Sequence, residues 1–423
     1  MRVLIFEPDH TGHHLHHVRA LAGAFSDLGT EVTVALDRAA PASREYDVHL
    51  GDLCAHVDAS MPESEGTPLA RAVAAARALA AAVRRHRPDH VLVPYGDGLT
   101  QVLGVGRLVA FNPFPRGVEA ETLLMRGGFA YPRERRREAL RDQVTLSAMA
   151  LAPWTRIHHL DPLPYDIVQK RGGALARRSR VIPEPVESSP CLDRLEARRQ
   201  LGVPEDGPYV GCVGMLDGRK GVDRLVRAFV EVAPRLPSAR LLLMGRVKAP
   251  VDAALAGEGA ALVRSGRIVV VDRYVSDEEL GTAFSALDLV CTPYPRHIGS
   301  SGVVVRAAAA ERPLLGSDFG WVGWSIRRFG LGHVCDVREP PAFARALEAS
   351  LGAAPLFRLG APARGFVAFH TMANFLAAWT ARARERLGLD PEPTGIGWGS
   401  VLAEADRASA FDVSPINPGG TGD

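Results

Sequence analysis

The stretch that decides the fold runs from Val213 to Val222 and reads VGMLDGRKGV. An apolar run over residues 209–213 ends at a glycine turn, two cations follow at Arg219 and Lys220, and a helical pattern begins at Gly221. A glycine turn between a strand and a helix presents backbone N–H groups and the positive end of the helix dipole to an anion. The two cations add charge that can pair with a diphosphate; the alternative interpretation is a solvated basic turn.

Short apolar runs alternate with longer amphipathic segments on both sides of this stretch, which is typical of α/β architecture. In the second half, strands are predicted over residues 209–213, 240–244, 268–271, 287–292 and 313–316, and helices over 221–233, 277–285 and 302–310. In the first half, strands are predicted over 3–6, 31–36 and 90–94, and helices over 15–28, 69–87 and 133–149. Two separate series, each opening with a strand and a turn, predict two doubly wound, Rossmann-like domains facing a central cleft.

Prolines at positions 183, 185 and 190 mark a linker between the two series. We therefore predict one domain over residues 1–187 and a second over 188–366. A further helix is predicted within residues 367–388. The glycine- and proline-rich segment 389–423 is predicted to be a flexible tail.

The composition is that of a globular protein, with 423 residues, 47% apolar and 23% charged. A net charge of +2 does not favour nucleic acid as a partner. The five cysteines lack paired short spacings, so reduced thiols are expected rather than a zinc site or disulfides. The opening apolar run is too short for a signal peptide, and no apolar run reaches the roughly 18 residues that span a membrane. These features predict a cytoplasmic protein.

A second candidate phosphate loop lies between a predicted strand and a predicted helix, over residues 293–303. Gly299 and Gly302 let the backbone approach a ligand, and Ser300 and Ser301 supply hydroxyls that can donate to phosphate oxygens. The alternative is that one of the two serines caps the helix.

Histidines gather in the loop after the first strand, over residues 10–17. His13 and His17 have the four-residue spacing of a helical metal site, but no carboxylate accompanies them as in HExxH. We therefore expect no metal and place the histidines at the carboxyl end of the sheet, where α/β proteins bind ligands. The residues that we predict as acceptor-side candidates are His13, His14, His16, His158 and His159.

An arginine-rich segment over residues 133–138 continues at Arg141. It is interpreted as a solvated helix face, because Glu134 and Glu138 interrupt the positive charge. The alternative is peripheral contact with an anionic membrane surface. The sequence does not indicate an oligomeric state.

The order of these motifs resembles the retaining glycosyltransferases of family 4, group 1 type, which have the GT-B fold. The resemblance is best over residues 181–336: VIPEPVE at 181–187, VGMLDGRKGVDRL at 213–225, YVSDEEL at 274–280 and ALDLV at 286–290 are similar to family segments. Residues 307–318 and the FGLG turn at 329–332 continue the likeness. The first half resembles the family only in its opening strand, the Gly12 loop and residues 151–173.

The resemblance implies a role for each matching residue. Arg219 and Lys220 would be the catalytic pair that neutralises the departing diphosphate. The domain over 188–366 would bind the donor, the domain over 1–187 would lie on the acceptor side, and the helix within 367–388 would cross back to it. Donor contacts are expected from these residues: Gly12, Gly214, Arg273, Tyr274, Gly299, Ser300, Ser301, Gly302 and Arg306.

The sequence also departs from the family pattern. Met215 replaces an arginine, and Ile298 and Arg306 stand where the family carries two glutamates. We therefore expect Arg306 either to change which donor the protein binds or to contact the donor phosphates. The family's histidine in the middle of the first domain has no clear counterpart, although Asn112 lies nearby.

These observations predict transfer of a hexose from a nucleoside diphosphate sugar, UDP- or GDP-linked, to a hydroxyl acceptor with retention and no required cofactor. Two cations and a helix N-terminus would stabilise the charge that develops on the leaving diphosphate. One alternative is a nucleotide-sugar epimerase of the same fold, which would use a histidine or acidic base. The other is a catalytically inactive binding partner, which the absent glutamate pair favours.

Overall fold

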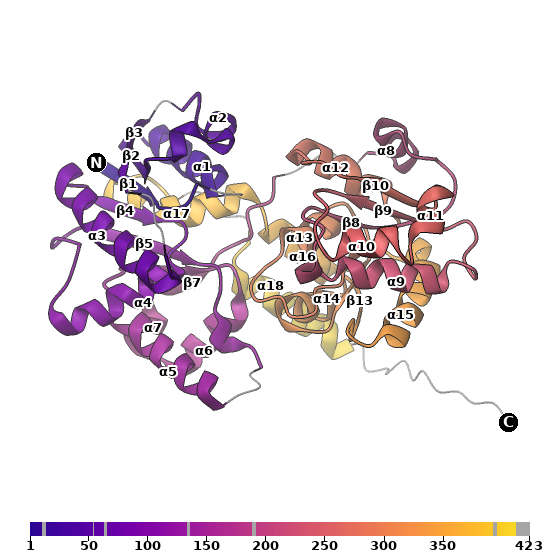
Figure 1. The fold of residues 1–423 in the computed structure, drawn as a ribbon. Coiled ribbons are helices and arrows are strands. Elements are labelled where there is room, and N and C mark those ends of the chain that lie inside the picture. Colours follow the sequence, from indigo (N-terminus) through magenta and orange to yellow (C-terminus); the bar gives the residue numbers. More distant parts are fainter. Residues whose placement is uncertain are drawn as a thin grey trace. The chain divides into compact units, whose positions relative to one another are not determined.

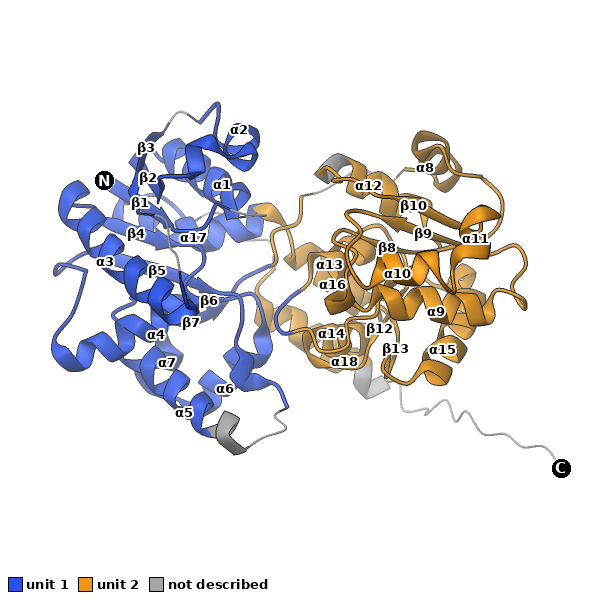
Figure 2. Cartoon of the chain, viewed as in Figure 1, with its two compact units in different colours: residues 1–183, 298–300, 373–394 blue, residues 184–297, 301–372, 395–423 orange. Residues whose placement is uncertain are grey.

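The computed structural model describes residues 1–10, 14–53, 55–62, 66–132, 136–187, 192–391 and 396–411, without the side chains of 136–139, 277–278 and 409–411. The chain divides into two compact units (Figure 2). The first comprises residues 1–183, 298–300 and 373–394, and the second comprises 184–297, 301–372 and 395–423.

The first unit contains a seven-stranded sheet in the order β3-β2-β1-β4-β5-β6-β7, in which every neighbouring pair is parallel (Figure 1). The strands are β1 (Arg2–Glu7), β2 (Glu31–Asp37), β3 (His56–Met61), β4 (His90–Val93), β5 (Glu119–Leu124), β6 (Arg156–His159) and β7 (Ser179–Val181). Five successive residues of β1 are buried, so both faces of this strand are covered. A parallel sheet needs such cover, because its crossover helices pack on both faces.

The helices of this unit begin and end at recognisable signals. Thr67 caps α3, Pro68 occupies its first turn, and Arg87 ends it in a left-handed conformation. The α-helices are α1 (His14–Asp27), α2 (Arg44–His49), α3 (Pro68–His86), α4 (Asp97–Gly106), α5 (Arg136–Leu151), α6 (Pro162–Arg171), α7 (Gly173–Arg178) and α17 (Met372–Arg386). The 3₁₀ helices are η1 (Ala40–Ala42), η2 (Arg107–Val109) and η3 (Gly128–Ala130).

Helix α17 comes from the far end of the sequence and completes the first unit. Phe375 and Trp379 on this helix are fully buried. The Phe375 ring lies 5.5 Å from that of His17 on α1, and the Trp379 ring lies 4.6 Å from that of His158 on β6. Burying two such rings contributes several kcal/mol, so this helix is part of the core of the first unit.

The second unit contains a six-stranded parallel sheet in the order β10-β9-β8-β11-β12-β13. The strands are β8 (Tyr209–Val213), β9 (Arg240–Met244), β10 (Ile268–Val271), β11 (Leu289–Thr292), β12 (Leu314–Ser317) and β13 (Gly332–Cys335). The α-helices are α8 (Arg194–Leu201), α9 (Val222–Val232), α10 (Val251–Ala256), α11 (Ala260–Arg264), α12 (Asp277–Ala286), α13 (Gly302–Ala309), α14 (Gly320–Phe329), α15 (Pro340–Ala353), α16 (Ala361–Phe369) and α18 (Trp398–Phe411). The 3₁₀ helices are η4 (Gly218–Lys220) and η5 (Ala354–Leu356).

The α/β fold class of two Rossmann-like, doubly wound domains predicted from the sequence is confirmed by the two sheets (Figure 1). The prediction of a flexible tail over residues 389–423 is wrong for residues 398–411, which form α18. Trp398, Val401 and Ala405 make an apolar stripe on α18 and are buried in the second unit. No helix among the described residues is long and apolar enough to cross a membrane.

Candidate functional site

The second sheet reverses its strand order between β8 and β11, which are hydrogen-bonded neighbours. In doubly wound sheets, ligands bind at the carboxyl ends of the two strands on either side of this switch point. The chain leaves β8 at Val213 and leaves β11 at Thr292. The two loops singled out from the sequence, 214–221 and 293–302, therefore start at the switch point of this unit.

The first loop is a tight turn that only glycine fits at two places. Gly214 has a φ of +97° and Gly221 a φ of +65°. A Cβ on Gly221 would lie 2.1 Å from the carbonyl oxygen of Pro293, so the two loops are in close contact. The Asp217 carboxylate accepts a hydrogen bond from the Lys220 N–H at 2.9 Å and closes the turn. This turn fixes the backbone from which Arg219 and Lys220 project.

Lys220 is partly buried beneath the turn. Its Nζ lies 5.6 Å from the centre of the Tyr294 ring, and 3.1 Å from the position of a Cβ added to Gly214. Within the part of the chain that the structure describes, Lys220 forms no ion pair with a carboxylate. Burial lowers the pKa of this ammonium group. Asp217 offsets this effect only in part, so a bound anion would stabilise the Lys220 ammonium further.

Arg219 differs from its neighbour. Its side chain is 60% exposed, and its Nε lies 3.7 Å from Asp217 Oδ2. Solvent screens a cation in this position. The two members of the predicted catalytic pair therefore differ: the Lys220 ammonium is partly buried, and the Arg219 guanidinium is exposed to solvent.

Two helix N-termini follow the two loops. Helix α9 begins after Gly221, and α13 begins after Ser301; neither has a side-chain cap. The alternative interpretation, in which Ser301 caps α13 through its hydroxyl, is wrong, because that side chain makes no capping hydrogen bond. Uncapped N–H groups and the helix dipoles favour an anion at both termini.

The second predicted loop is divided between the two units. Residues 298–300 belong to the first unit, where the Gly299 N–H donates to the Tyr131 hydroxyl at 2.9 Å. Ser301 and Gly302 belong to the second unit, where a Cβ on Gly302 would lie 3.4 Å from Glu184 Oε1. The donor-binding role of Gly299, Ser300, Ser301 and Gly302 stays a prediction. Glu184 lies in the linker motif 181–187 and was not among the predicted site residues.

The remaining donor-side residues are spread over the same unit. Arg273 and Tyr274 follow β10, two strands from β8, and both are exposed. Arg273 pairs with Glu279 at 2.5 Å, and this hydrogen bond together with that from the Ser276 N–H lowers the pKa of Glu279 to about 2. Arg306 lies in the last turn of α13 and is partly exposed.

Two of the predicted histidines are buried in the first unit. His158 and His159 on β6 are 1% and 2% exposed. Nε2 of His158 and Nε2 of His90 donate to the two oxygens of Glu121, at 2.7 and 3.0 Å. Burial alone would raise the pKa of Glu121, but these hydrogen bonds outweigh it and lower the pKa to about 2. His158 and His159 are thus held within the first unit, and their predicted place on the acceptor side stays a prediction.

The other histidines lie after β1. His14 is the first residue of α1 and is partly exposed. His17 is buried, and its Nδ1 shares a hydrogen bond with the Tyr95 hydroxyl at 3.0 Å. His16 is partly exposed, and its ring makes an edge contact with that of His49 at 5.7 Å. Gly12 and His13 lie outside the described residues, as does the arginine-rich segment except for Arg141 and the backbone of 136–138.

Metal and thiol chemistry gain no support from the described part of the chain. Within it, no group of three histidine, cysteine or acidic side chains is placed to hold a metal ion. Cys212, Cys291 and Cys335 are free thiols, and burial raises the pKa of Cys212 to about 11 and that of Cys335 to about 12. These thiols stay protonated and unreactive at neutral pH.

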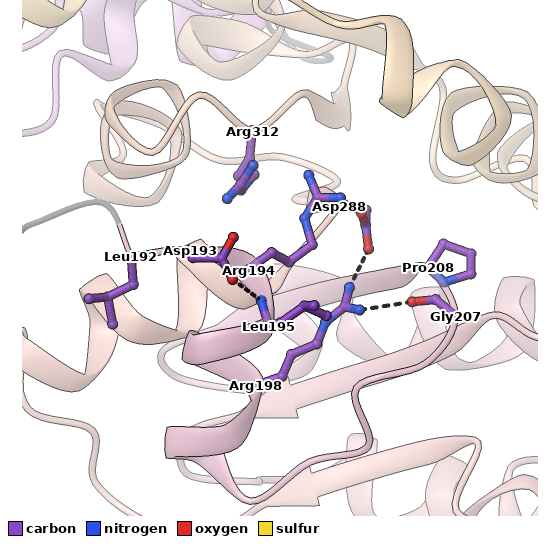
Figure 3. A pocket seen from close by; sticks show the side chains of 9 residues that line it. All are labelled: Leu192, Asp193, Arg194, Leu195, Arg198, Gly207, Pro208, Asp288 and Arg312. Carbon is purple, nitrogen blue, oxygen red and sulfur yellow. Dashed lines mark hydrogen bonds and ion pairs between the residues drawn. The ribbon is translucent and has the colours of Figure 1, made fainter.

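A pocket of about 650 Å³ lies at the amino ends of β8 and β11, away from the two loops described above (Figure 3). Asp288, just before β11, pairs with Arg194 at 2.6 Å and with Arg198 at 2.7 Å. Arg312 donates to the Ser285 carbonyl at 2.9 Å. Because the charges of this pocket are largely satisfied and it lies at the amino ends of the strands, we interpret it as a structural ion network.

The two parallel, doubly wound sheets correspond to the GT-B fold. A family profile described as "Glycosyl transferases group 1" matches residues 207–352. A D-inositol 3-phosphate glycosyltransferase of Nocardia farcinica is 30% identical over 52% of this chain and 50% of its own length. Residues 207–352 are thus similar to the group 1 glycosyltransferases, and the chain spans about half the length of the curated relatives that it matches.

Solved structures show the same fold at low sequence identity. Sucrose-phosphate synthase from Thermosynechococcus elongatus is 18% identical with a TM-score of 0.65, covering 92% of this chain and 99% of its own. Anabaena Alr3699/HepE in complex with UDP is 16% identical with a TM-score of 0.64, covering 92% and 100%. At these identities the likeness concerns the fold alone.

Proposed function

We propose that the protein transfers a hexosyl group from a nucleoside diphosphate sugar to a hydroxyl acceptor, with retention at the anomeric carbon. The observation that carries the proposal is Lys220, a partly buried ammonium that forms no salt bridge among the described residues, at the switch point of the family-matched unit. A departing diphosphate is the anion that this position would stabilise. The uncapped N-termini of α9 and α13 supply N–H donors to the same kind of charge.

The mechanism follows from where negative charge develops. As the bond between the anomeric carbon and the diphosphate oxygen breaks, its electron pair stays with the diphosphate. Lys220 is already partly desolvated by the fold, so less solvent reorganises around it during the reaction than around a free ammonium. Arg219 adds a screened charge, and we assign it a supporting role in donor binding. No cofactor is needed in this scheme.

The names of similar proteins suggest the order in which candidate donors and acceptors should be tested. One of them was solved with UDP, so a UDP-linked sugar is the first donor to test and a GDP-linked sugar the second. A relative is named for D-inositol 3-phosphate, so inositol phosphates are the first acceptors to test. The retained configuration of the product is checked by the anomeric coupling constant in a proton NMR spectrum.

The decisive experiment compares wild type, Lys220→Met and the matched control Lys170→Met, since Lys170 is an exposed lysine on α6. Each is screened for thermal shifts with UDP-, GDP-, ADP- and dTDP-sugars, and then for transfer. A donor should raise the melting temperature of wild type and of Lys170→Met, and less that of Lys220→Met. Epimerised donor without an acceptor would instead support the epimerase. Donor binding without turnover across many acceptors would support the inactive partner.

A further inference from the structure

Helices α4 and α5 of the first unit pack against each other, with η2 following α4 and α7 at the carboxyl end of α5 (Figure 1). A Cβ on Gly104 would lie 1.9 Å from the carbonyl oxygen of Ala148, so the two long helices are in close contact. Arg178 on α7 donates to the carbonyl oxygens of Met149 and Ala150 on α5, at 2.6 and 2.7 Å. These contacts join the four elements into one layer within the first unit.

The solvent side of this layer exposes large apolar side chains. Leu108 is 71% exposed and Leu140 is 70% exposed. On α5, Leu140, Val144 and Leu151 follow one another at intervals of four and seven residues, so they form one stripe on the side away from the buried Leu146. Apolar side chains gathered on one exposed face indicate an interaction site. We call this face the α4–α5 surface, and its exposed apolar residues are Val105, Leu108, Val109, Leu140, Val144 and Leu151.

The exposed charges of the same layer are positive. Among the described side chains of α4, η2, α5 and α7, the exposed charged ones are Arg107, Arg141 and Arg177. The acidic side chains described there are only partly exposed: Asp97 accepts hydrogen bonds from two backbone N–H groups, and Asp142 also has a partner. Arg141 is the one arginine of the segment 133–141 whose side chain the structure describes. The α4–α5 surface therefore combines aliphatic side chains with unopposed positive charge.

We propose that the α4–α5 surface docks the protein on an anionic lipid membrane. Its leucine and valine side chains enter the boundary between the headgroups and the acyl chains, and its arginines bind lipid phosphates. An arginine can do this beside apolar residues, because its aliphatic stem packs along them while the guanidinium stays at the level of the headgroups.

The chemistry of the α4–α5 surface favours a lipid over a protein partner. Its six exposed apolar side chains are all aliphatic, whereas tryptophan and tyrosine are enriched at the energetic centres of protein interfaces. A second copy of the chain, related by a two-fold axis, would place arginines opposite arginines, and like charges across an interface disfavour it. An anionic bilayer offers the opposite charge together with an apolar interior.

The test is flotation of the full chain with vesicles of phosphatidylcholine alone or mixed with an equal amount of phosphatidylglycerol. Wild type should bind the mixed vesicles, and less so at high salt, because salt screens the attraction. Leu108→Ser with Leu140→Ser should weaken this binding at least about tenfold, since two exposed leucines no longer enter the bilayer. Arg107→Gln with Arg141→Gln should weaken it about tenfold or more and reduce its salt dependence.

Matched controls come from exposed residues of the second unit. Leu195→Ser with Leu356→Ser, and Arg264→Gln with Arg358→Gln, should bind the mixed vesicles as wild type does. All four double variants should melt at the wild-type temperature, because the replaced side chains are exposed.

Three results would overturn the proposal: no binding of wild type to the mixed vesicles, equal binding to both kinds of vesicle, or wild-type binding by Leu108→Ser with Leu140→Ser. A wild-type dimer that this leucine variant dissociates, without vesicle binding, would assign the surface to a second copy instead. Flotation requires no glycosyl transfer, so its outcome is independent of the proposed function.

Discussion

Replacing Lys220 with methionine removes one charge and keeps most of the aliphatic stem, so it tests the leaving-group role directly. Two unit charges about 4 Å apart interact by about 4 kcal/mol at an effective dielectric constant of about 20. Removing one charge-stabilising donor from other active sites lowers kcat about 10²–10³-fold. We expect a loss of that size for Lys220→Met. For Arg219→Met we expect less than about tenfold, because its side chain is 60% exposed and screened.

The Lys220→Met substitution should not lower the stability of the fold, although it lowers kcat. Burial lowers the pKa of Lys220 in the folded state, so the unfolded chain binds this proton more tightly than the folded one. The charge therefore opposes folding at neutral pH, and the opposition fades as pH rises through the lowered pKa. We expect Lys220→Met to melt at the same temperature as wild type or higher at pH 7.

The assay pairs single-turnover transfer with thermal melting at pH 7, using Lys170→Met as the control. Lost transfer with a maintained melting temperature supports the assignment. Transfer by Lys220→Met within threefold of wild type would refute the reasoning. Parallel loss of transfer and stability would assign Lys220 a packing role.

Four further outcomes are expected. Gly221→Ala should lower both stability and transfer, because Gly221 has a positive φ and the new Cβ would lie 2.1 Å from the Pro293 carbonyl oxygen. The control in urea unfolding is Gly365→Ala, whose new Cβ would have nothing within 4 Å. Asp161→Asn should raise the free energy of unfolding at pH 7 but not at pH 4. Burial raises the pKa of Asp161 to about 6, so the wild-type protein loses stability as pH rises through that value. Trp398→Ala should cost about 3 kcal/mol and Arg407→Ala little, both measured by chemical denaturation. Chelation by EDTA should leave the rate of transfer unchanged, since the proposed mechanism relies on Lys220 and helix termini.

Much of the fold could be predicted from periodicity. The strands over 209–213, 240–244 and 268–271 were predicted at their observed bounds, because they are short apolar runs between turn signals. Strands β5 and β6 were missed, because Glu121 and His158 interrupt their apolar pattern. Those two side chains satisfy each other across 37 positions of sequence, and such a pairing exists only in the folded sheet.

The candidate site was predictable to a similar degree. The glycine turn identifies the loop after β8, but it does not predict that Lys220 is less exposed than Arg219. That difference arises because Lys220 packs near Tyr294 and Gly214 in the folded protein.

The position of α17 has a consequence for how the protein is made. A ribosome releases residues 1–183 long before Phe375 and Trp379, yet these two rings fill the core of the first unit. That unit stays incomplete while residues 184–297 and 301–372 of the second unit are synthesised. A gene cut at 183/184 should therefore yield an N-terminal product that aggregates, and co-expressing a peptide that covers residues 372–391 should recover it.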